Sequence, residues 1–314
     1  MTDLPPIEIR GLTKRFGQAL AVDSLTLAVP EGSVFGFLGP NGAGKTTTIR
    51  VLMGLANPTA GEVRLLGEVA GPACPAKRLV GFLPDVPAFY GWMTGPEYLR
   101  FAGDLFGLER SALKKRVGEL LDLTGLTGVK TRIGGYSRGM KQRLGLAQAL
   151  VNEPRLVILD EPTSALDPIG RHEVLETIQA MAQRTTVFFS THILADVERV
   201  CDRVAILDQG RLLAEDTMVA LKARYSRPIF KVRLAAGSEE FAQTASQAKW
   251  AEKVESLEGE VRILARDGET AKVEIPRLIG SRGLALEGFE ISEPTLEDIF
   301  LKLVGEGKAS HARS

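Results

Sequence analysis

Residues 39–47 read GPNGAGKTT, and Gly39, Gly44, Lys45 and Thr46 in this stretch fit the pattern G-x-x-x-x-G-K-[ST]. The apolar run VFGFL precedes the stretch and the helical pattern TTTIRVLMGL follows it, which is the strand–loop–helix context that this pattern requires. Glycines let the backbone approach phosphate oxygens closely, and the start of the helix supplies N–H groups and the positive end of a dipole. The stretch therefore predicts a phosphate-binding loop.

The loop also supplies side chains for chemistry. The nucleotide contacts that we expect from it are made by Gly39, Pro40, Asn41, Gly42, Ala43, Gly44, Lys45, Thr46 and Thr47. Lys45 places a compact positive charge beside the phosphates, which makes it a candidate catalytic residue, and the hydroxyl of Thr46 can bind Mg²⁺. A glycine-rich turn that binds nothing is the alternative. By chance the pattern arises in roughly one chain of this length in a hundred, even before the flanking strand and helix are required.

A second signal is the apolar run LVILDEP, which ends in Asp160 and Glu161. A buried strand delivers both carboxylates to the carboxyl edge of the sheet, where ligands of open α/β sheets bind. Asp160 suits the coordination shell of magnesium, because hard cations take oxygen ligands. Glu161 suits the water that attacks a γ-phosphate. An ordinary strand end with solvated acids is the alternative, which the phosphate-binding loop earlier in the chain disfavours.

Composition limits the classes of function. The chain has 314 residues, more than one typical domain, and 39 Lys and Arg against 39 Asp and Glu. This balance argues against a protein that grips a nucleic-acid backbone, which needs an excess of cations on one face. Cys74 and Cys201 are too few for a disulfide framework or a zinc site and indicate a reducing compartment. There is no uncharged apolar run of about 18 residues, so we expect any membrane role to be peripheral.

The order of patterns along the chain indicates two domains. Up to about residue 225, strand-like runs alternate with helical patterns, which predicts an α/β fold with a mostly parallel sheet. The run VAILDQGRLLAE predicts a hairpin that turns at Gln209 and Gly210. Residues 226–305 are expected to form a small α+β domain of βαββαβ type that serves dimerisation or regulation, and residues 306–314 a disordered tail.

Residues 136–150 read YSRGMKQRLGLAQAL and narrow the class further. The stretch resembles the signature motif of ATP-binding cassette (ABC) ATPases and, as in that family, lies just upstream of the second acidic motif. A helix that begins at Ser137, Arg138 and Gly139 can present amides and a hydroxyl to a phosphate. The resemblance implies that two ATPase domains pair head to tail, and that each signature helix contacts the γ-phosphate of the ATP held by its partner.

The rest of residues 1–225 is similar to the cassette pattern in order. The resemblance implies a P-loop nucleotide hydrolase with an antiparallel β subdomain and a helical subdomain over about residues 86–152. Phe16 falls where the family stacks an aromatic ring on adenine, although a lone Phe near a strand is more often part of a core. Asp167 falls in the loop at the dimer interface, and His192 falls where a histidine contacts the γ-phosphate and orients the water.

Two features depart from the usual family pattern. Asp85 follows the strand VGFLP at a position where the family usually has Gln and related exporter ATPases often have Glu. Aspartate can still bind magnesium or its water. In the signature, Arg138 replaces the usual Gly and Tyr136 the usual Leu. This version of the motif, together with the ending EPTLEDIFLKL, resembles the branch of ABC ATPases that works with separate export permeases of the ABC-2 type.

Residues 88–108 are rich in aromatic side chains. Some of them have near-helical spacing and are expected in the core of the helical subdomain. Tyr90 and Trp92 instead lie in a loop punctuated by Pro and Gly, directly after Asp85, where helical packing gives no reason for large aromatics. In the family this region receives a short cytoplasmic helix of the permease. Our hypothesis is that Tyr90 and Trp92 line that groove.

We therefore expect the ATPase subunit of a multisubunit ABC exporter, peripheral on the cytoplasmic face of the cell membrane. It would bind ATP and Mg²⁺ and promote in-line attack of water on the γ-phosphate. The expected partners are an integral-membrane permease subunit and a second ATPase subunit, most simply a copy of this chain, with no nucleic acid. A non-transport ABC ATPase that acts on the ribosome or DNA is the alternative, against which the single cassette and the neutral charge count.

Overall fold

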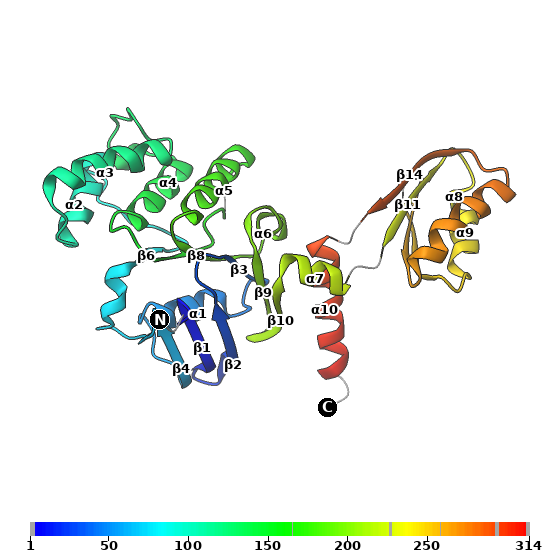
Figure 1. Ribbon diagram of the computed structural model, residues 1–314, viewed down its shortest axis with the longest axis horizontal. Coiled ribbons are helices and arrows are strands. Elements are labelled where there is room, and N and C mark those ends of the chain that lie inside the picture. Colours follow the sequence, from blue (N-terminus) through cyan, green and yellow to red (C-terminus); the bar gives the residue numbers. More distant parts are fainter. Residues whose placement is uncertain (1–3, 165, 226–227, 258, 293–294, 312–314) are drawn as a thin grey trace. The chain divides into compact units, whose positions relative to one another are not determined.

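The computed structural model describes residues 4–164, 166–225, 228–257, 259–292 and 295–311. The chain divides into two compact units, residues 1–218 and 219–314, and each is considered by itself (Figure 1). The domain boundary that the sequence predicts, between residues 225 and 226, lies a few residues beyond this division.

Two sheets form the framework of the first unit. The larger has the strand order β10-β9-β3-β8-β7-β6, in which only the β9–β10 pair is antiparallel. Its strands are β3 (Val34–Leu38), β6 (Val80–Leu83), β7 (Leu156–Asp160), β8 (Thr186–Thr191), β9 (Arg203–Asp208) and β10 (Arg211–Thr217). The smaller sheet is antiparallel, in the order β2-β1-β4-β5, with β1 (Ile7–Phe16), β2 (Ala19–Val29), β4 (Ala60–Leu65) and β5 (Glu68–Val69). The predicted α/β fold with an antiparallel subdomain is confirmed.

The helices of the first unit fall into two groups. Those that connect strands are α1 (Lys45–Leu52), α5 (Pro168–Ala182) and α6 (Leu194–Val200), and short 3₁₀ segments lie at Pro75–Leu79 and Ile133–Gly135. Between β6 and β7, α2 (Gly95–Leu105), α3 (Arg110–Leu123) and α4 (Arg138–Ala149) gather in a helical subdomain (Figure 1). All three lie within the range 86–152 that we expect for that subdomain.

The core of the first unit surrounds α1. Every residue of β3, β7 and β8 is buried, as expected for parallel strands covered on both faces. The rings of Phe35 and Phe37 lie 5.9 and 5.1 Å from that of Phe188 on the neighbouring strand. Helix α1 contacts β2 and β4 of the smaller sheet and β7 of the larger one. The helix that follows the phosphate loop is therefore held by both sheets.

The predicted hairpin joins β9 to β10. Gln209 and Gly210 have φ angles of 47° and 81°, the left-handed pair that a two-residue turn of type I′ requires. The amide of Gly210 donates to the carbonyl oxygen of Ala43 at 3.2 Å, and its carbonyl oxygen accepts from the amide of Asp23 at 2.8 Å. The turn therefore ties the phosphate loop to β2.

The second unit contains the predicted βαββαβ sandwich. Its antiparallel sheet has the order β12-β13-β11-β14, and its elements are α7 (Met218–Tyr225), β11 (Ile229–Leu234), α8 (Ser238–Ser246), β12 (Ala251–Leu257), β13 (Glu260–Ala265), α9 (Gly268–Ser281), β14 (Leu286–Ser292) and α10 (Leu296–His311). Phe230, Phe241 and Ile263 are fully buried in its core. Helix α10 continues to His311, into the segment 306–314 expected to be disordered, and the last three residues lie outside the described ones. None of the described helices is long and apolar enough to cross a bilayer.

Gly81 in β6 tests how tightly the helical subdomain meets the sheet. A Cβ at this position would lie 1.9 Å from the carbonyl oxygen of Ala149 at the end of α4, so Gly81→Ala must move backbone. We expect it to lower the free energy of unfolding by about 2–3 kcal/mol, as overpacked cores do. Gly118→Ala in α3 is the control, because nothing lies within 4 Å of its added Cβ. Gly118→Ala should raise the free energy of unfolding by about 0.5–1 kcal/mol. If urea titrations show the same change in this free energy for both variants, the packing described at Gly81 is contradicted.

Candidate active site

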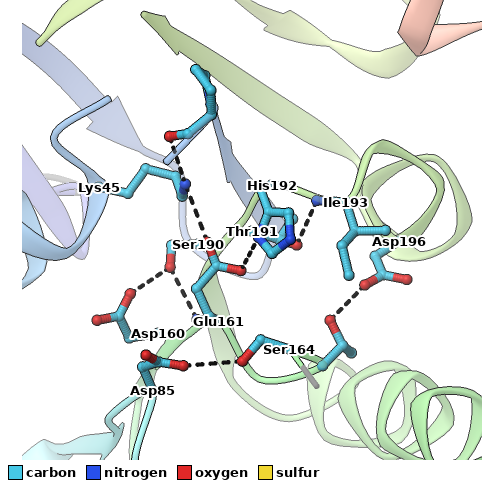
Figure 2. A network of polar contacts seen from close by, with 12 residues as sticks. Lys45, Asp85, Asp160, Glu161, Ser164, Ser190, Thr191, His192, Ile193 and Asp196 are labelled. Atoms are coloured by element: carbon cyan, nitrogen blue, oxygen red, sulfur yellow. Dashed lines mark hydrogen bonds and ion pairs between the residues drawn. The ribbon is translucent and has the colours of Figure 1, made fainter. Parts of the chain in front are cut away.

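The carboxyl ends of β3, β7 and β8 bring the sequence-predicted catalytic residues together. Lys45 begins α1 after the loop that follows β3. Asp160 is the last residue of β7 and Glu161 follows it, and His192 follows β8 (Figure 2). These strands are neighbours in the sheet, so residues from distant parts of the sequence meet at one edge. Figure 2 shows Glu161 between Lys45 and His192.

The phosphate loop has its shape because two glycines leave no room for a side chain. Gly44 has φ 99°, and a Cβ there would lie 2.6 Å from the carbonyl oxygen of Ala21. A Cβ on Gly39 would lie 2.6 Å from the carbonyl oxygen of Leu207. Within the loop, Gly39, Ala43, Gly44 and Lys45 are buried, Pro40, Thr46 and Thr47 are half-buried, and Asn41 and Gly42 are exposed.

The ammonium group of Lys45 is buried, with 5% of the side chain exposed. Its Nζ donates to the carbonyl oxygens of Gly39 at 2.6 Å and Pro40 at 3.2 Å. It also forms an ion pair with Oε1 of Glu161 at 3.1 Å. A buried charge is costly unless it is paired and hydrogen-bonded, and these three oxygens satisfy the ammonium.

Glu161 is held by both its backbone and its carboxylate. Its φ angle is 50°, in the left-handed region that non-glycine residues seldom adopt, and its amide donates to the hydroxyl of Ser190 at 3.1 Å. Its Oε2 lies 2.8 Å from Nδ1 of His192, whose side chain is 43% exposed. Unusual backbone conformations of this kind cluster at functional sites. The carboxylate thus spans from the buried lysine to a histidine at the surface.

Asp160 lies beside the hydroxyl group expected to bind metal. Its Oδ1 accepts hydrogen bonds from Ser190 Oγ at 2.6 Å and from Thr46 Oγ1 at 3.2 Å. Burial raises the pKa of Asp160, the two hydrogen bonds oppose this rise, and the charges of Asp85 and Glu161 add to it. A hydroxyl and a carboxylate oxygen side by side are the ligand type that Mg²⁺ prefers. The residues present therefore fit a magnesium ion, whose charge would favour ionised Asp160.

Asp85 is exposed after β6, and its Oδ1 accepts a hydrogen bond from Ser164 Oγ at 3.0 Å. Ser164 follows Glu161 in the chain, and its amide donates to the carbonyl oxygen of Glu161 at 3.1 Å. Asp85 is therefore linked to the segment that carries the carboxylate of Glu161. A role as a metal ligand stays a prediction.

The other residues taken from the family pattern lie at helix starts. Ser137 caps α4 by accepting from the amide of Met140 at 3.2 Å, and Arg138 begins the helix; both are exposed. The half-buried Gly139 follows. Asp167 is exposed as well and caps α5 by accepting from the amide of Gly170 at 2.9 Å. Ala165, in the same loop, lies outside the described residues.

Two aromatic residues have clear surroundings. Phe16, at the end of β1, is 52% exposed, and Nζ of Lys14 lies 4.7 Å from the centre of its ring. Such an exposed ring can stack on a base. Tyr136 is only 5% exposed, and a Cβ on Gly95 would lie 2.8 Å from its hydroxyl oxygen. The tyrosine that replaces the usual leucine thus packs against the start of α2, where a glycine makes room for it.

Sequence reasoning missed several polar residues of this site. The hydroxyl of Ser190 donates to Asp160 and accepts from the amide of Glu161. Its position near the end of β8, two residues before His192, is a signal that would have found it. Asp196 is fully buried in α6, where no sequence signal singles it out.

Comparisons with known proteins agree with this geometry. The family described as ABC transporter matches residues 22–164, and the family described as ATP-binding protein DrrA1-3-like, C-terminal domain, matches residues 217–304. The chain is similar to the bacitracin transport ATP-binding protein BcrA of Bacillus licheniformis, with 36% identity over 96% of this chain and 98% of the relative. It is 34% identical to the daunorubicin resistance ATP-binding protein DrrA2 of Streptomyces coeruleorubidus, over 95% of each chain.

Solved structures show the same fold. An ATP-binding subunit of an ABC transporter matches with a TM-score of 0.63 and 31% identity, over 70% of this chain and 92% of that one. A dimeric post-hydrolysis cassette bound to ADP and phosphate matches with a TM-score of 0.61 and 23% identity, over 68% and 98%. An uncharacterised ABC transporter ATP-binding protein of Bacillus subtilis, YxlF, is 40% identical over 95% of this chain and 99% of its own length. The chain therefore belongs to the ATP-binding proteins of ABC transporters, the branch of ATP hydrolases that carries a DrrA-like C-terminal domain.

Proposed function

We propose that this chain is the ATPase subunit of a multisubunit ABC exporter and that it powers a separate membrane permease. The observation that carries the proposal is the placement of Glu161 between Lys45 and His192, beside Asp160 and Thr46, in a chain with this family's signature helix. The relatives support export, because they are named for bacitracin transport and daunorubicin resistance. No observation favours an action on the ribosome or on DNA.

Each catalytic residue has a separate part in hydrolysis. Lys45 neutralises charge on the transferring phosphate, and Glu161 positions the attacking water and takes its proton. His192 orients the carboxylate through the 2.8 Å contact and remains open to solvent. Thr46 and Asp160, with Asp85 nearby, would hold Mg²⁺, which would supply positive charge to stabilise the charge that develops on the phosphate. The reaction needs no covalent intermediate.

The ion pair between Lys45 and Glu161 gives this site a resting state. While the pair is intact, Oε1 of the carboxylate is held by the ammonium group of Lys45 at 3.1 Å. A phosphate group carries more negative charge than one carboxylate and can take over the ammonium. Binding of ATP would then release Glu161 to act on water, so that the base is activated only when substrate is present.

The proposed active form is a head-to-tail dimer at the cytoplasmic face of the cell membrane. At the start of α4, Ser137 and Arg138 are exposed and Gly139 is half-buried, a placement that suits contact with the γ-phosphate of a partner. Asp167 is exposed at a second helix start and suits the dimer interface. A homodimer would have two complete sites, because this chain carries both halves.

The proposed permease contact lies in the aromatic loop after Asp85. Tyr90 and Trp92 are 51% and 65% exposed, and their ring centres are 6.0 Å apart. Tyr90 also packs edge-on against Phe101 of α2 at 5.7 Å, which fixes the pair to the helical subdomain. Exposed aromatics on a rigid base are typical anchors of protein interfaces. For the second unit, which lacks a phosphate loop, we propose a part in dimerisation or regulation.

Glu161→Gln tests the base. The variant keeps the shape of the side chain but cannot take a proton, so hydrolysis should slow about a hundredfold or more. ATP binding should persist, and an ATP-bound dimer should accumulate in size-exclusion chromatography. Glu176→Gln is the control, because Glu176 lies on α5 with 59% of its side chain exposed and forms a local pair with His172. Near-normal turnover by Glu161→Gln would remove this residue from the mechanism.

A mixing experiment tests the head-to-tail dimer. Lys45→Ala and Ser137→Arg chains should each be inactive alone, whereas their mixture should regain about one working site per heterodimer, because one site then combines an intact loop with an intact signature. As the control, Lys45→Ala mixed with the double variant Lys45→Ala/Ser137→Arg has no intact loop and should stay inactive. If the mixture of Lys45→Ala and Ser137→Arg chains forms heterodimers but shows no ATPase activity, the two motifs do not meet across an interface.

Trp92→Ala tests the permease contact. Removal of an interface anchor costs about 2 kcal/mol or more, so the affinity for detergent-solubilised permease should fall about thirtyfold. The ATPase activity of the isolated subunit should change little, because Trp92 is exposed outside the catalytic residues. Leu105→Ala is the matched control, since Leu105 is an apolar residue of the same subdomain that is 73% exposed. Equal co-purification of permease with both variants would contradict the assignment.

A further inference from the structure

A single buried carboxylate, Asp196, joins three segments of the active site. It lies in α6 and has no exposed surface. Its Oδ2 accepts a hydrogen bond from Thr163 Oγ1 at 2.6 Å, and its Oδ1 accepts from Nε of Arg171 at 2.5 Å. Thr163 is 1% exposed, so this part of the network is closed to water.

Each end of the network lies close in sequence to a residue of the site. Thr163 comes directly after Glu161 and Pro162, and Asp196 lies in the helix that begins just after His192. Arg171 lies in the first turn of α5, and its amide donates to the carbonyl oxygen of Asp167 at 2.9 Å. The three segments joined by Asp196 therefore carry the base, the histidine and the residue at the proposed dimer interface.

The hydrogen bonds of Asp196 are better suited to fixing the positions of the three segments than to stabilising the fold. A buried carboxylate is costly unless all its partners are present, and a buried ion pair is by itself weak evidence of stability. Two charge-assisted or short hydrogen bonds from opposite sides leave the carboxylate little freedom to move. Hydrogen bonds also fix the backbone around His192. The amide of Ile193 donates to Thr191 Oγ1 at 3.0 Å, and the amide of Asp196 donates to the carbonyl oxygen of Ile193 at 3.1 Å.

We propose that Asp196 is a positioning residue that holds His192 in contact with Glu161. Through Arg171 it also links both residues to the start of α5. The contact of 2.8 Å between Nδ1 of His192 and Oε2 of Glu161 then depends on a carboxylate that touches neither of them. A displacement of Asp167 at the dimer interface reaches His192 through Arg171 and Asp196. This inference rests on the proposed function, because it assigns a device that controls the same hydrolytic site.

Asp196→Asn in the full chain tests the proposal, since the amide has the same shape but cannot accept from both donors with a full charge. We expect kcat to fall about tenfold or more with KM for ATP changed less than about twofold, because substrate contacts are intact. Asp202→Asn is the matched control. Asp202 follows the C-terminal end of α6 and accepts a hydrogen bond from the amide of Val34 at 2.9 Å. Because this contact is outside the network, kcat of Asp202→Asn should stay within about twofold of the kcat of the unaltered protein.

A double-variant cycle separates positioning from general damage. If Asp196 acts through the histidine, Asp196→Asn should reduce kcat little further in a His192→Ala chain, whereas independent effects would multiply. Multiplied losses would overturn the proposal. Thr163→Val provides a second variant with nearly the same volume, and it should lower kcat in the same non-additive way. If Asp196→Asn does not fold, as judged by its thermal transition, Thr163→Val decides the question.

A spectroscopic measurement keeps this inference distinct from the proposed function. The chain has 3 histidines, so the ring resonances of His192 can be assigned by loss in His192→Ala. In Asp196→Asn and Thr163→Val these resonances should move toward those of the exposed His172, and in Asp202→Asn they should not. Absence of ATP hydrolysis by the unaltered protein would refute the proposed function alone. Unmoved His192 resonances in both network variants would refute the positioning role, whatever the activity.

Discussion

The site depends on one buried cation that must always have a partner. The ammonium group of Lys45 is surrounded by oxygens of its own loop and by the carboxylate of Glu161. Because an unpaired charge at this depth is costly, the loop, the end of β7 and any bound phosphate compete for the same group. In the proposed mechanism, substrate binding and activation of Glu161 as the base therefore both result from one exchange of partners at Lys45, and the parallel sheet places the loop and the end of β7 next to this group.

The parallel sheet and the loop were predictable because their signals are local. Buried parallel strands read as continuous apolar runs, and a phosphate loop needs glycines at set positions, as Gly39 and Gly44 show by their lack of room for a Cβ. Strand β12 has a weaker signal, because most of its residues are exposed and several are Glu or Lys, so that its sequence shows little alternation of apolar and polar residues. Composition also could not predict where α10 ends, because a polar C-terminal stretch favours helix and coil almost equally.

The sequence predicted the principal residues of the candidate site, but it did not predict the buried residues that hold them in place. Lys45, Asp160, Glu161 and His192 each stand at a strand end or a helix start, positions that sequence patterns mark. Asp196 is polar within a short helix and resembles any surface acid in the sequence, yet it is fully buried. Its importance arises only from long-range contacts with Thr163 and Arg171, which no local pattern encodes.

The turn between β9 and β10 has a consequence for engineering. Two-residue hairpin turns at a surface are ordinarily safe places for an epitope, a fluorescent label or a longer loop. Here Gly210 is bonded to Ala43 in the phosphate loop and to Asp23 in β2, and a Cβ on it would lie 2.9 Å from the carbonyl oxygen of Ala21. An insertion at this turn would displace the phosphate-binding loop, so a position that looks dispensable in the sequence supports the shape of that loop.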